Sequence, residues 1–401
     1  MTSYSEAVAR FCPDGVRMAE LGDVAEIRSG WGFPHAEQGI ASGRYPFFKV
    51  SDMNLPGNAV SMTRANNWID AATAYRLGVS PAPAGTVIFP KIGAAIATNK
   101  KRLLTQDSAY DNNVMGLVPS NQLVPRFLLY WLQTVDLSQI ANDSGAVPSI
   151  RKSEMATRAI PVPPLEVQSE IVRILDQFVQ LEAELEAELD ARARQFEHYL
   201  NVLTNPFRSN KVLKAGWSSA KLGDVCRVEK GATPIQKAIP GSYPLVATAA
   251  ERRSSTEYQF DSDAVCIPLI SSKGHGVASI SRVYFQSGKF ALGSILAAAV
   301  PNDAMALSAE FLYRYFDARK DFLLVSLMRG GANVSLTIDS LKSVPVFFPS
   351  LNEQKRISAA LRQLDLLVTD KSGGLAVELT ARRKQYEYYR DKLLTFDETA
   401  A

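Results

Sequence analysis

Basic and amide side chains gather in a few polar stretches of this sequence, and their types suit the binding of nucleic acid. The stretch "TNKKRL" (98–103) follows a β-like run, and "YDNNV" (110–114) comes shortly after it. Guanidinium and ammonium groups neutralise phosphates, and asparagine amides pair with base edges. The candidate DNA contacts in the first half of the chain are Trp31, Lys49, Lys91, Asn99, Lys100, Lys101, Arg102, Asn112 and Asn113.

The second half of the chain carries comparable basic residues. Arg252 and Arg253 lie in "ERRSS" (251–255). Lys273 lies in the turn-like "SSKGHGV", and Lys289 precedes an apolar run. For any one of these residues, a solvated surface side chain is the simpler interpretation. Because basic clusters recur in loop-like stretches of both halves, the pattern as a whole favours binding.

Motifs for catalysis are missing from the sequence. There is no P-loop and no dinucleotide-binding glycine motif, and no spacing of Cys and His suits zinc. Four glutamates alternate in "EAELEAE" (182–188), and at a spacing of two they face different sides of a helix, which indicates a solvated face. The stretch "NPF" (205–207) resembles an amino-methyltransferase motif only faintly, since it lacks the second proline. We therefore predict no catalytic residue, no metal and no cofactor.

Composition places the chain in a broad class. The formal charge is +3 with a pI near 8.6, which permits nucleic acid binding without arguing for it. Three cysteines without a C-x-x-C pair suit a reducing compartment. The first residues lack the apolar stretch of a signal peptide, and the longest apolar run, 290–300, is about half a membrane span. These features predict a cytoplasmic protein with no membrane partner.

The chain is built from two diverged copies of one unit. "ELGDVAEIRSG" (20–30) returns as "KLGDVCRVEKG" (221–231), and "ARQFEHYLNVL" (193–203) returns as "RKQYEYYRDKL" (383–393). Each copy begins with short β-like runs and amphipathic helices, and each ends in a long helical stretch. A repeat of this length decides the architecture before any local element does.

The two long stretches have the apolar spacing of coiled coils. From 166 to 203 there is no Pro or Gly, and apolar residues fall three and four apart. The second stretch, 352–394, contains Ser372-Gly373-Gly374, which should weaken or kink the helix. Two apolar seams in one chain most simply pack together. The predicted fold class is α+β, with two pseudo-repeated globular domains separated by a long antiparallel two-helix coiled coil.

The ordered motifs resemble those of a known family. Each copy starts with LGDV and then carries a glycine-containing segment, "SGAVPSI" (144–150) or "GGANVSL" (330–336). Next comes "IPVPPLEVQSEIVRIL" (160–175) or "VPVFFPSLNEQKRISAAL" (344–361), and the helix ends in Q-[FY]-E-x-Y. In this arrangement the chain resembles, over nearly its whole length, the specificity (S) subunit of type I restriction–modification enzymes.

The resemblance implies a function and a set of partners. Each globular unit would be a target recognition domain that reads one half of a bipartite site in double-stranded DNA. The helices would space these domains and dock two methyltransferase (M) subunits, which carry S-adenosylmethionine and methylate adenine. Restriction (R) subunits would add translocation and cleavage, while the S subunit itself catalyses nothing. The expected partner contacts are the aromatic residues of the repeated helix motif, Phe196, Tyr199, Tyr386 and Tyr389.

The expected limits are 1–163 and 206–349 for the recognition domains, and 164–205 and 350–396 for the spacer helices. Two other interpretations remain open. One is an S-like recognition subunit of a fused methyltransferase–nuclease or another phage-defence complex, which neighbouring genes would distinguish. The other is a two-headed scaffold that binds proteins or glycans, which salt-sensitive DNA binding would exclude.

Overall fold

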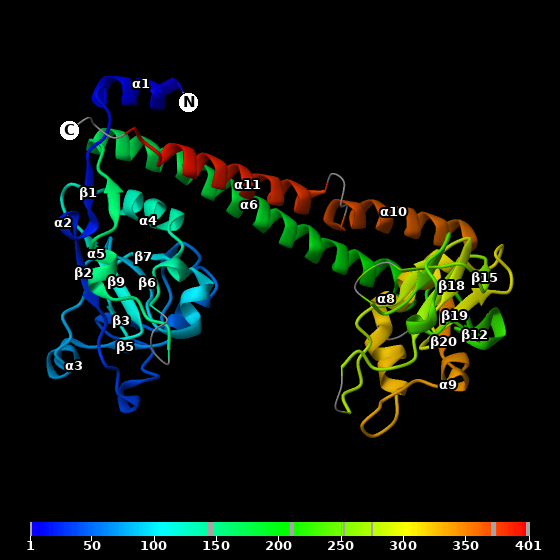
Figure 1. Cartoon of the computed structure of the whole chain (residues 1–401). Coiled ribbons are helices and arrows are strands. Elements are labelled where there is room, and N and C mark those ends of the chain that lie inside the picture. The colour runs from blue at the N-terminus through cyan, green and yellow to red at the C-terminus, as the bar shows by residue number, and fades with distance from the viewer. Residues whose placement is uncertain are drawn as a thin grey trace. The chain divides into compact units, whose positions relative to one another are not determined.

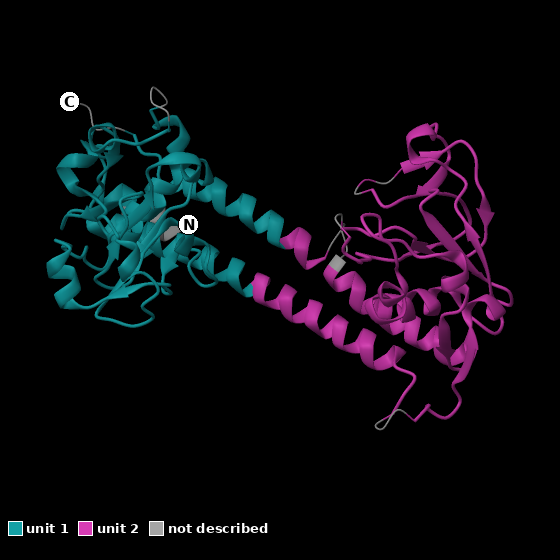
Figure 2. Ribbon diagram, turned by 90° about the horizontal axis from the view of Figure 1, so that it is seen from below, with its two compact units in different colours: residues 1–184, 379–401 teal, residues 185–378 magenta. Residues whose placement is uncertain are grey.

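The chain forms two compact units, coloured separately in Figure 2. Unit 1 comprises Met1–Glu184 and Leu379–Ala401, and unit 2 comprises Leu185–Glu378. Each unit contains one sheet domain and parts of the long helices, and the sheet domains are called domain 1 and domain 2 below. The computed structural model describes residues 2–142, 147–208, 212–249, 251, 253–273, 276–369 and 374–397.

Domain 1 is built on two sheets and a separate ribbon (Figure 1). One sheet has the order β2-β9-β6-β7-β4, the other has the order β5-β3-β8, and β1 pairs with β10. The strands are β1 (Met18–Glu20), β2 (Ala25–Ser29), β3 (Tyr45–Phe48), β4 (Ser61–Met62), β5 (Trp68–Ile69), β6 (Val87–Pro90), β7 (Arg102–Leu104), β8 (Ala109–Tyr110), β9 (Val114–Pro119) and β10 (Ala159–Pro161). Every residue of β6 is buried, as its apolar run "VIFP" and its central place in the sheet require.

Helix α4 supplies most of the helical part of the core of domain 1. Pro125 stands in its first turn, where a missing N–H costs no hydrogen bond, and the six residues from Phe127 to Leu132 are buried. The helices and 3-10 turns of domain 1 are α1 (Thr2–Phe11), α2 (Leu21–Val24), η1 (His35–Glu37), η2 (Val50–Asn54), α3 (Ala71–Arg76), η3 (Gly93–Thr98), α4 (Pro125–Thr134), η4 (Leu137–Gln139) and α5 (Lys152–Ala156).

Domain 2 repeats this plan. Its sheets have the orders β12-β19-β16-β17 and β14-β13-β18-β15, and β11 pairs with β20. In each domain the second sheet contains one parallel pair, β3 with β8 and β13 with β18. Its strands are β11 (Ser218–Lys221), β12 (Cys226–Lys230), β13 (Tyr243–Val246), β14 (Arg253–Ser255), β15 (Phe260–Asp261), β16 (Ala264–Pro268), β17 (Tyr284–Gln286), β18 (Lys289–Leu292), β19 (Leu296–Pro301) and β20 (Pro345–Phe348). Its helices and turns are α7 (Leu222–Val225), η6 (Ile235–Lys237), α8 (Ala309–Leu323), η7 (Val325–Leu327) and α9 (Ile338–Lys342).

The first long stretch is one helix, α6 (Leu165–Thr204), as its periodicity predicts. Within unit 1 it packs against α11 (Leu375–Leu393). The rings of Phe178 and Tyr389 stack with centroids 5.4 Å apart, and Arg383 Nε donates to Glu182 Oε1 at 2.7 Å. Because the contacts run in opposite directions along the two helices, this pair is antiparallel.

The second long stretch is divided between α10 (Leu351–Thr369) and α11. Gly374 precedes α11, while Ser372 and Gly373 lie outside the described residues. The predicted weak point therefore falls where one helix ends and the next begins. The structure supports the expected class: it is mixed α+β, with two related sheet domains joined by long helices.

Each sheet domain is fastened to the helix that follows it by one buried glutamine. Gln168 is fully buried, and its Oε1 accepts from the N–H of Val124, just before α4, at 2.8 Å. Its Nε2 donates to the carbonyls of Gln122 and Pro163, each at 2.8 Å. Gln354 repeats the arrangement in unit 2 by accepting from the N–H of Ser308 and donating to the carbonyls of Ala306 and Pro349. The glutamine shared by both copies of the sequence thus has the same structural role twice.

Candidate DNA interface

One edge of domain 1 gathers several of the candidate residues. Strands β2, β3 and β6 end at this edge and β9 begins there, so four loops meet. The Lys91 N–H donates to the Asn113 carbonyl at 2.8 Å, and the Trp31 N–H donates to the Tyr110 carbonyl at 2.9 Å. The surface called edge 1 consists of Trp31, Lys49, Lys91, Asn112 and Asn113. Residues up to about 80 positions apart in the sequence therefore converge on one surface.

Lys91 is the most confined cation of edge 1. Its Nζ donates to Ser29 Oγ at 3.0 Å, and its burial, together with nearby Lys152, lowers the pKa of its ammonium group. A half-buried cation beside a second cation is a favourable place for an anion such as a phosphate. Lys152, at the start of α5, was missed by the sequence analysis, although the adjacent "RK" at 151–152 could have drawn attention to it.

A glycine holds the backbone of edge 1 in close contact. A Cβ on Gly30 would lie 1.9 Å from the carbonyl oxygen of Asp111, so no side chain fits there without movement of the backbone. A Cβ on Gly231, the matching residue of the second copy, would lie 2.1 Å from the carbonyl oxygen of Gly293. In both domains, the residue at the end of the LGDV segment is therefore glycine because a backbone carbonyl leaves no room for a side chain.

Lys101 and Asn99 are occupied within domain 1. Lys101 is only 2% exposed, and its Nζ donates to Asn99 Oδ1 at 2.6 Å and to the Val135 carbonyl at 2.7 Å. Burial lowers the pKa of Lys101 to about 8. Asn99 adopts the left-handed conformation, and its Oδ1 also accepts from the Leu137 N–H at 3.0 Å. These two residues tie the start of β7 to the end of α4, and their predicted DNA contact stays a prediction.

Lys100 and Arg102 are half-buried against η2. Lys100 donates to Asn54 Oδ1, and Arg102 Nη2 lies 3.4 Å from the Met53 carbonyl. Because η2 begins directly after Lys49, this pair adjoins edge 1. The structure therefore divides the "NKKR" cluster into two residues that brace the domain and two that lie toward the candidate surface.

The candidates of domain 2 are more scattered. Arg253 and Lys273 are exposed, Arg253 lying in β14 opposite Leu245. Lys289 is exposed at the start of β18, where its ammonium lies 4.9 Å from the centroid of the Tyr258 ring. Strands β13 and β18 are parallel, so both end at the same edge of their sheet. Lys289 lies at the opposite edge, where β18 begins. Arg252 lies outside the described residues.

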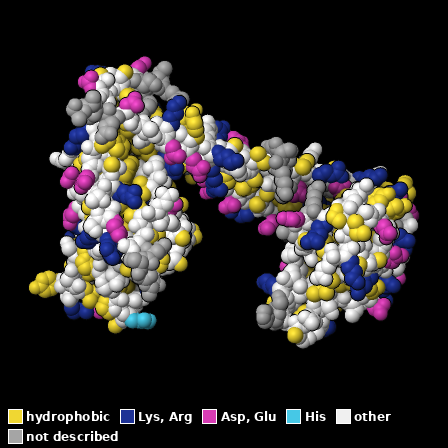
Figure 3. Space-filling view, viewed as in Figure 1, with side chains coloured by type: hydrophobic (Ala, Val, Ile, Leu, Met, Phe, Trp, Pro, Cys, Tyr) yellow, Lys and Arg dark blue, Asp and Glu magenta, His cyan; other side chains and the backbone are white. Residues whose placement is uncertain are grey.

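The surface drawn in Figure 3 carries charges of both signs. On the face drawn in Figure 3, basic side chains lie among acidic and uncharged ones in each unit. Among the described residues, no group of His, Cys, Asp and Glu could hold a metal ion, and no helix is long and apolar enough to cross a membrane. Burial raises the pKa of both Cys226 and Cys266 to about 12, which makes them poor nucleophiles.

The family model of the type I restriction modification DNA specificity domain matches residues 13–192 and again residues 214–380. The chain belongs to this family. It is a DNA specificity subunit of a type I restriction–modification system, with two target recognition domains and no catalysis of its own. Membership implies DNA and the other subunits of such a system as partners.

Individual relatives support the same assignment of the specificity subunit. The specificity subunit of the Escherichia coli enzyme EcoR124I/EcoR124II is 29% identical over 327 residues, covering 75% of this chain and 78% of the relative. A putative specificity subunit of Haemophilus influenzae is 29% identical over 337 residues, covering 77% and 82%. The crystal structure of an S subunit from M. genitalium matches the fold with a TM-score of 0.56 at 15% identity, covering 95% of this chain and 96% of that one.

Most of the repeated helix aromatics of the specificity subunit pack within their own unit. Tyr386 and Tyr389 contact the core of unit 1, and Phe196 contacts the core of unit 2. Tyr199 is 40% exposed and presents more of its ring to solvent. The expected partner contacts of all four stay predictions, with Tyr199 the most accessible of them.

We expect Lys91→Ala to weaken DNA binding by the assembled complex about 5–10-fold across many sequences and to lower the salt slope by about one, because a phosphate contact releases counterions. The measurement is a titration of duplex DNA at several salt concentrations. Lys355→Ala is the matched control, since Lys355 is an exposed cation on α10, outside domain 1 and outside the candidate contacts. If Lys91→Ala left the salt dependence of DNA affinity unchanged, Lys91 would have only a structural role, through its hydrogen bond to Ser29.

Proposed function

We propose that each sheet domain of this specificity subunit reads one half of a bipartite site in double-stranded DNA. The proposed limits of the recognition domains are 1–163 and 206–349. The observation that supports this assignment is the convergence of four loops on edge 1, where basic, amide and aromatic side chains lie together. Direct readout needs such side chains to be held rigidly while they face the groove.

Within domain 1, we propose that the contacts come from edge 1, with Lys100, Arg102 and Lys152 beside it. Lys91 and Lys152 suit phosphates, since two cations lie close together there. Asn112 and Asn113 are exposed and carry the amide groups that pair with bases. Within domain 2, the proposed contacts are Arg252, Arg253, Lys273 and Lys289, with Arg282 as an addition, because its Nη2 lies 3.3 Å from the Ala249 carbonyl beyond the end of β13.

We propose that the long helices, 164–205 and 350–396, set the gap between the half-sites and dock two M subunits. Helix α6 is a single helix of 40 residues, and a helix has a fixed rise per residue. The M subunits supply S-adenosylmethionine and the chemistry, and R subunits join the same complex. The specificity subunit needs no cofactor for this role, and we place the assembly in the cytoplasm with its DNA.

The proposal is tested by exchanging one domain. Residues 21–161, from the LGDV segment to the end of β10, are replaced by the matching segment of a relative with a different target. The complex with its M subunits should then methylate a site in which one half has changed and the other half is retained. Sequencing of methylated adenines in the host genome measures both halves at once.

The reciprocal exchange of residues 222–347 serves as the control and should change the other half only. If either exchange alters both halves together, the two-reader assignment is wrong. If neither changes the site, recognition lies outside the sheet domains.

A further inference from the structure

The two units share one structural frame, so their residues can be compared position by position. The buried Gln168 and Gln354 fix the starts of α4 and α8 in the same way, through the N–H groups of Val124 and Ser308. Counting from these anchors, Tyr130 of α4 matches Arg314 of α8. The match holds in space: Tyr130 lies against Tyr386 of one repeated helix motif, and Arg314 lies against the equivalent Phe196 of the other.

At one matched pair of positions the charges are reversed. Arg126 of α4 pairs with Asp176 of α6 at 2.7 Å in unit 1. Glu310 of α8 pairs with Arg362 of α10 in unit 2, with Nε to Oε1 at 2.9 Å. The two units therefore use an ion pair of opposite polarity at this matched position.

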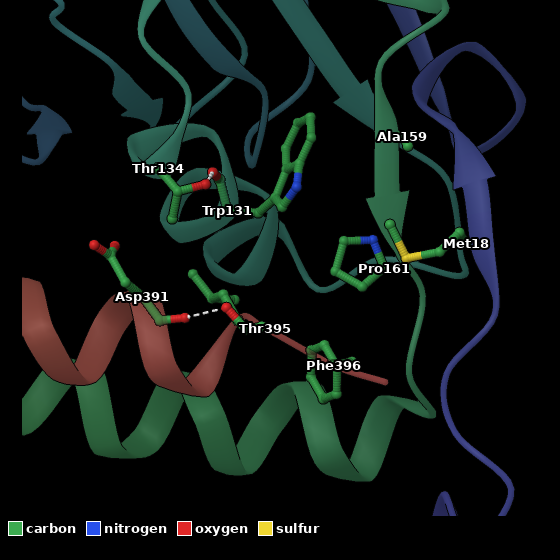
Figure 4. Close-up of a pocket in the computed structure, with 9 residues that line it drawn as sticks. Met18, Trp131, Thr134, Ala159, Pro161, Asp391, Thr395 and Phe396 are labelled. Atoms are coloured by element: carbon green, nitrogen blue, oxygen red, sulfur yellow. Dashed lines mark hydrogen bonds between the residues drawn. The ribbon is translucent and has the colours of Figure 1, made fainter. Parts of the chain in front are cut away.

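The end of α11 contacts domain 1 through apolar packing and a side-chain hydrogen bond. Tyr386 donates its hydroxyl to Gln133 Oε1 at 2.5 Å. Leu394, directly after α11, is 7% exposed and belongs to the core of unit 1. Figure 4 shows Trp131 and Thr134 of α4 facing the end of α11 across a cavity of about 300 Å³ that Leu394 also lines. Since α4 stops at Thr134, domain 1 extends no charged side chain from α4 beyond this point.

The end of α6 meets domain 2 through polar contacts at the equivalent place. Thr204, which matches Leu394, is fully buried, and its Oγ1 accepts from Arg319 Nη1 at 2.6 Å. The same hydroxyl donates to the Leu200 carbonyl at 2.6 Å. Arg319 is available because α8 continues to Leu323, beyond the position where α4 ends. Its second nitrogen, Nη2, lies 3.4 Å from the Asn201 carbonyl.

We propose that these contacts make each domain selective for one helix end. Domain 1 accepts only the end of α11, and domain 2 accepts only the end of α6. With α11 on domain 2, Leu394 would face the Arg319 guanidinium and remove its hydroxyl acceptor. With α6 on domain 1, Phe196 would leave Gln133 without its donor. A half-buried charged or polar group without a partner is costly. The contacts therefore disfavour the exchange of the two helix ends between the two domains.

The test uses the full chain, with thermal unfolding and amide hydrogen exchange as readouts. Thr204→Leu should lower the midpoint of unfolding by about 4–8 °C and speed exchange in α8 and the last turns of α6, with domain 1 unaffected. Adding Arg319→Met should recover at least half of that shift, because an unbranched apolar side chain suits the new leucine. The mirror variant Leu394→Thr should loosen α4 and α11, and Arg319→Met should not rescue it.

Rescue by Arg319→Met of the unit 2 variant alone distinguishes a selective contact from a general effect on packing. The proposal would be overturned if Arg319→Met restored the unfolding midpoint of both Thr204→Leu and Leu394→Thr, or of neither. Should Thr204→Leu fail to fold, Thr204→Val removes the hydroxyl at nearly constant volume and must show the same rescue. Val202→Leu, an exposed residue in the same turn of α6, is the matched control and should shift the midpoint by less than about 1 °C.

Discussion

Replacement of Gln168 by leucine is expected to lower the free energy of unfolding of unit 1 by about 3–5 kcal/mol. The substitution nearly preserves volume but removes three hydrogen bonds of 2.8 Å. It leaves the N–H before α4 and two carbonyls buried without partners, and each such group costs about 1–3 kcal/mol. For a unit of about 200 residues the midpoint of thermal unfolding should fall by roughly 10 °C.

The controls for this prediction lie in the same chain. Gln180 is an exposed glutamine of the same helix, and Gln180→Leu should change stability by less than about 0.5 kcal/mol. Gln354→Leu should reproduce the loss in unit 2, with rapid amide exchange in α8 instead of α4. If Gln168→Leu were as mild as Gln180→Leu, the glutamine would not fasten domain 1 to α6.

Gly30→Ala is expected to distort edge 1 and to cost about 3 kcal/mol or more. The new methyl group would lie 1.9 Å from the Asp111 carbonyl oxygen, and this neighbour is backbone, which cannot rotate away. Trp31 follows directly and Asn113 is two residues from Asp111, so the candidate contacts shift with the clash. Under the proposed function, recognition of one half-site should be lost while the other half is retained. Amide exchange and methylation of half-site variants are the two measurements.

Gly32 offers a nearby comparison, because a Cβ there would meet no atom within 4 Å. Gly32→Ala should leave both stability and target unchanged. Gly231→Ala should transfer the defect to domain 2, where the methyl group would lie 2.1 Å from the Gly293 carbonyl oxygen. Equal effects of Gly30→Ala and Gly32→Ala would show that the close approach has no bearing on recognition.

The large-scale architecture could be predicted because its signals repeat and are local. The LGDV segments, the two glutamines and the Q-[FY]-E-x-Y motifs return in the same order, which indicates two copies of one unit. Apolar residues three and four apart predict α6 with bounds within one residue of those observed, since helical periodicity depends only on neighbours in the chain. The start of α11 at Leu375, directly after Gly374, agrees with the local cost of glycine in a helix.

The role of individual residues depended on contacts that no local pattern contains. Lys101 and Lys100 are adjacent and look alike in the sequence, yet Lys101 is buried because its ammonium reaches the carbonyl of Val135, 34 residues away. Edge 1 exists because β9 pairs with both β2 and β6, and strand pairing brings together loops that are far apart in the chain. The sequence by itself determined the repeat and the helices, since these depend on local pattern and period, and it indicated the family through the resemblance of its ordered motifs. Only the tertiary structure decided which cations reach solvent, which glycines cannot change and which helix end each domain holds, because burial and steric contact are set by long-range packing.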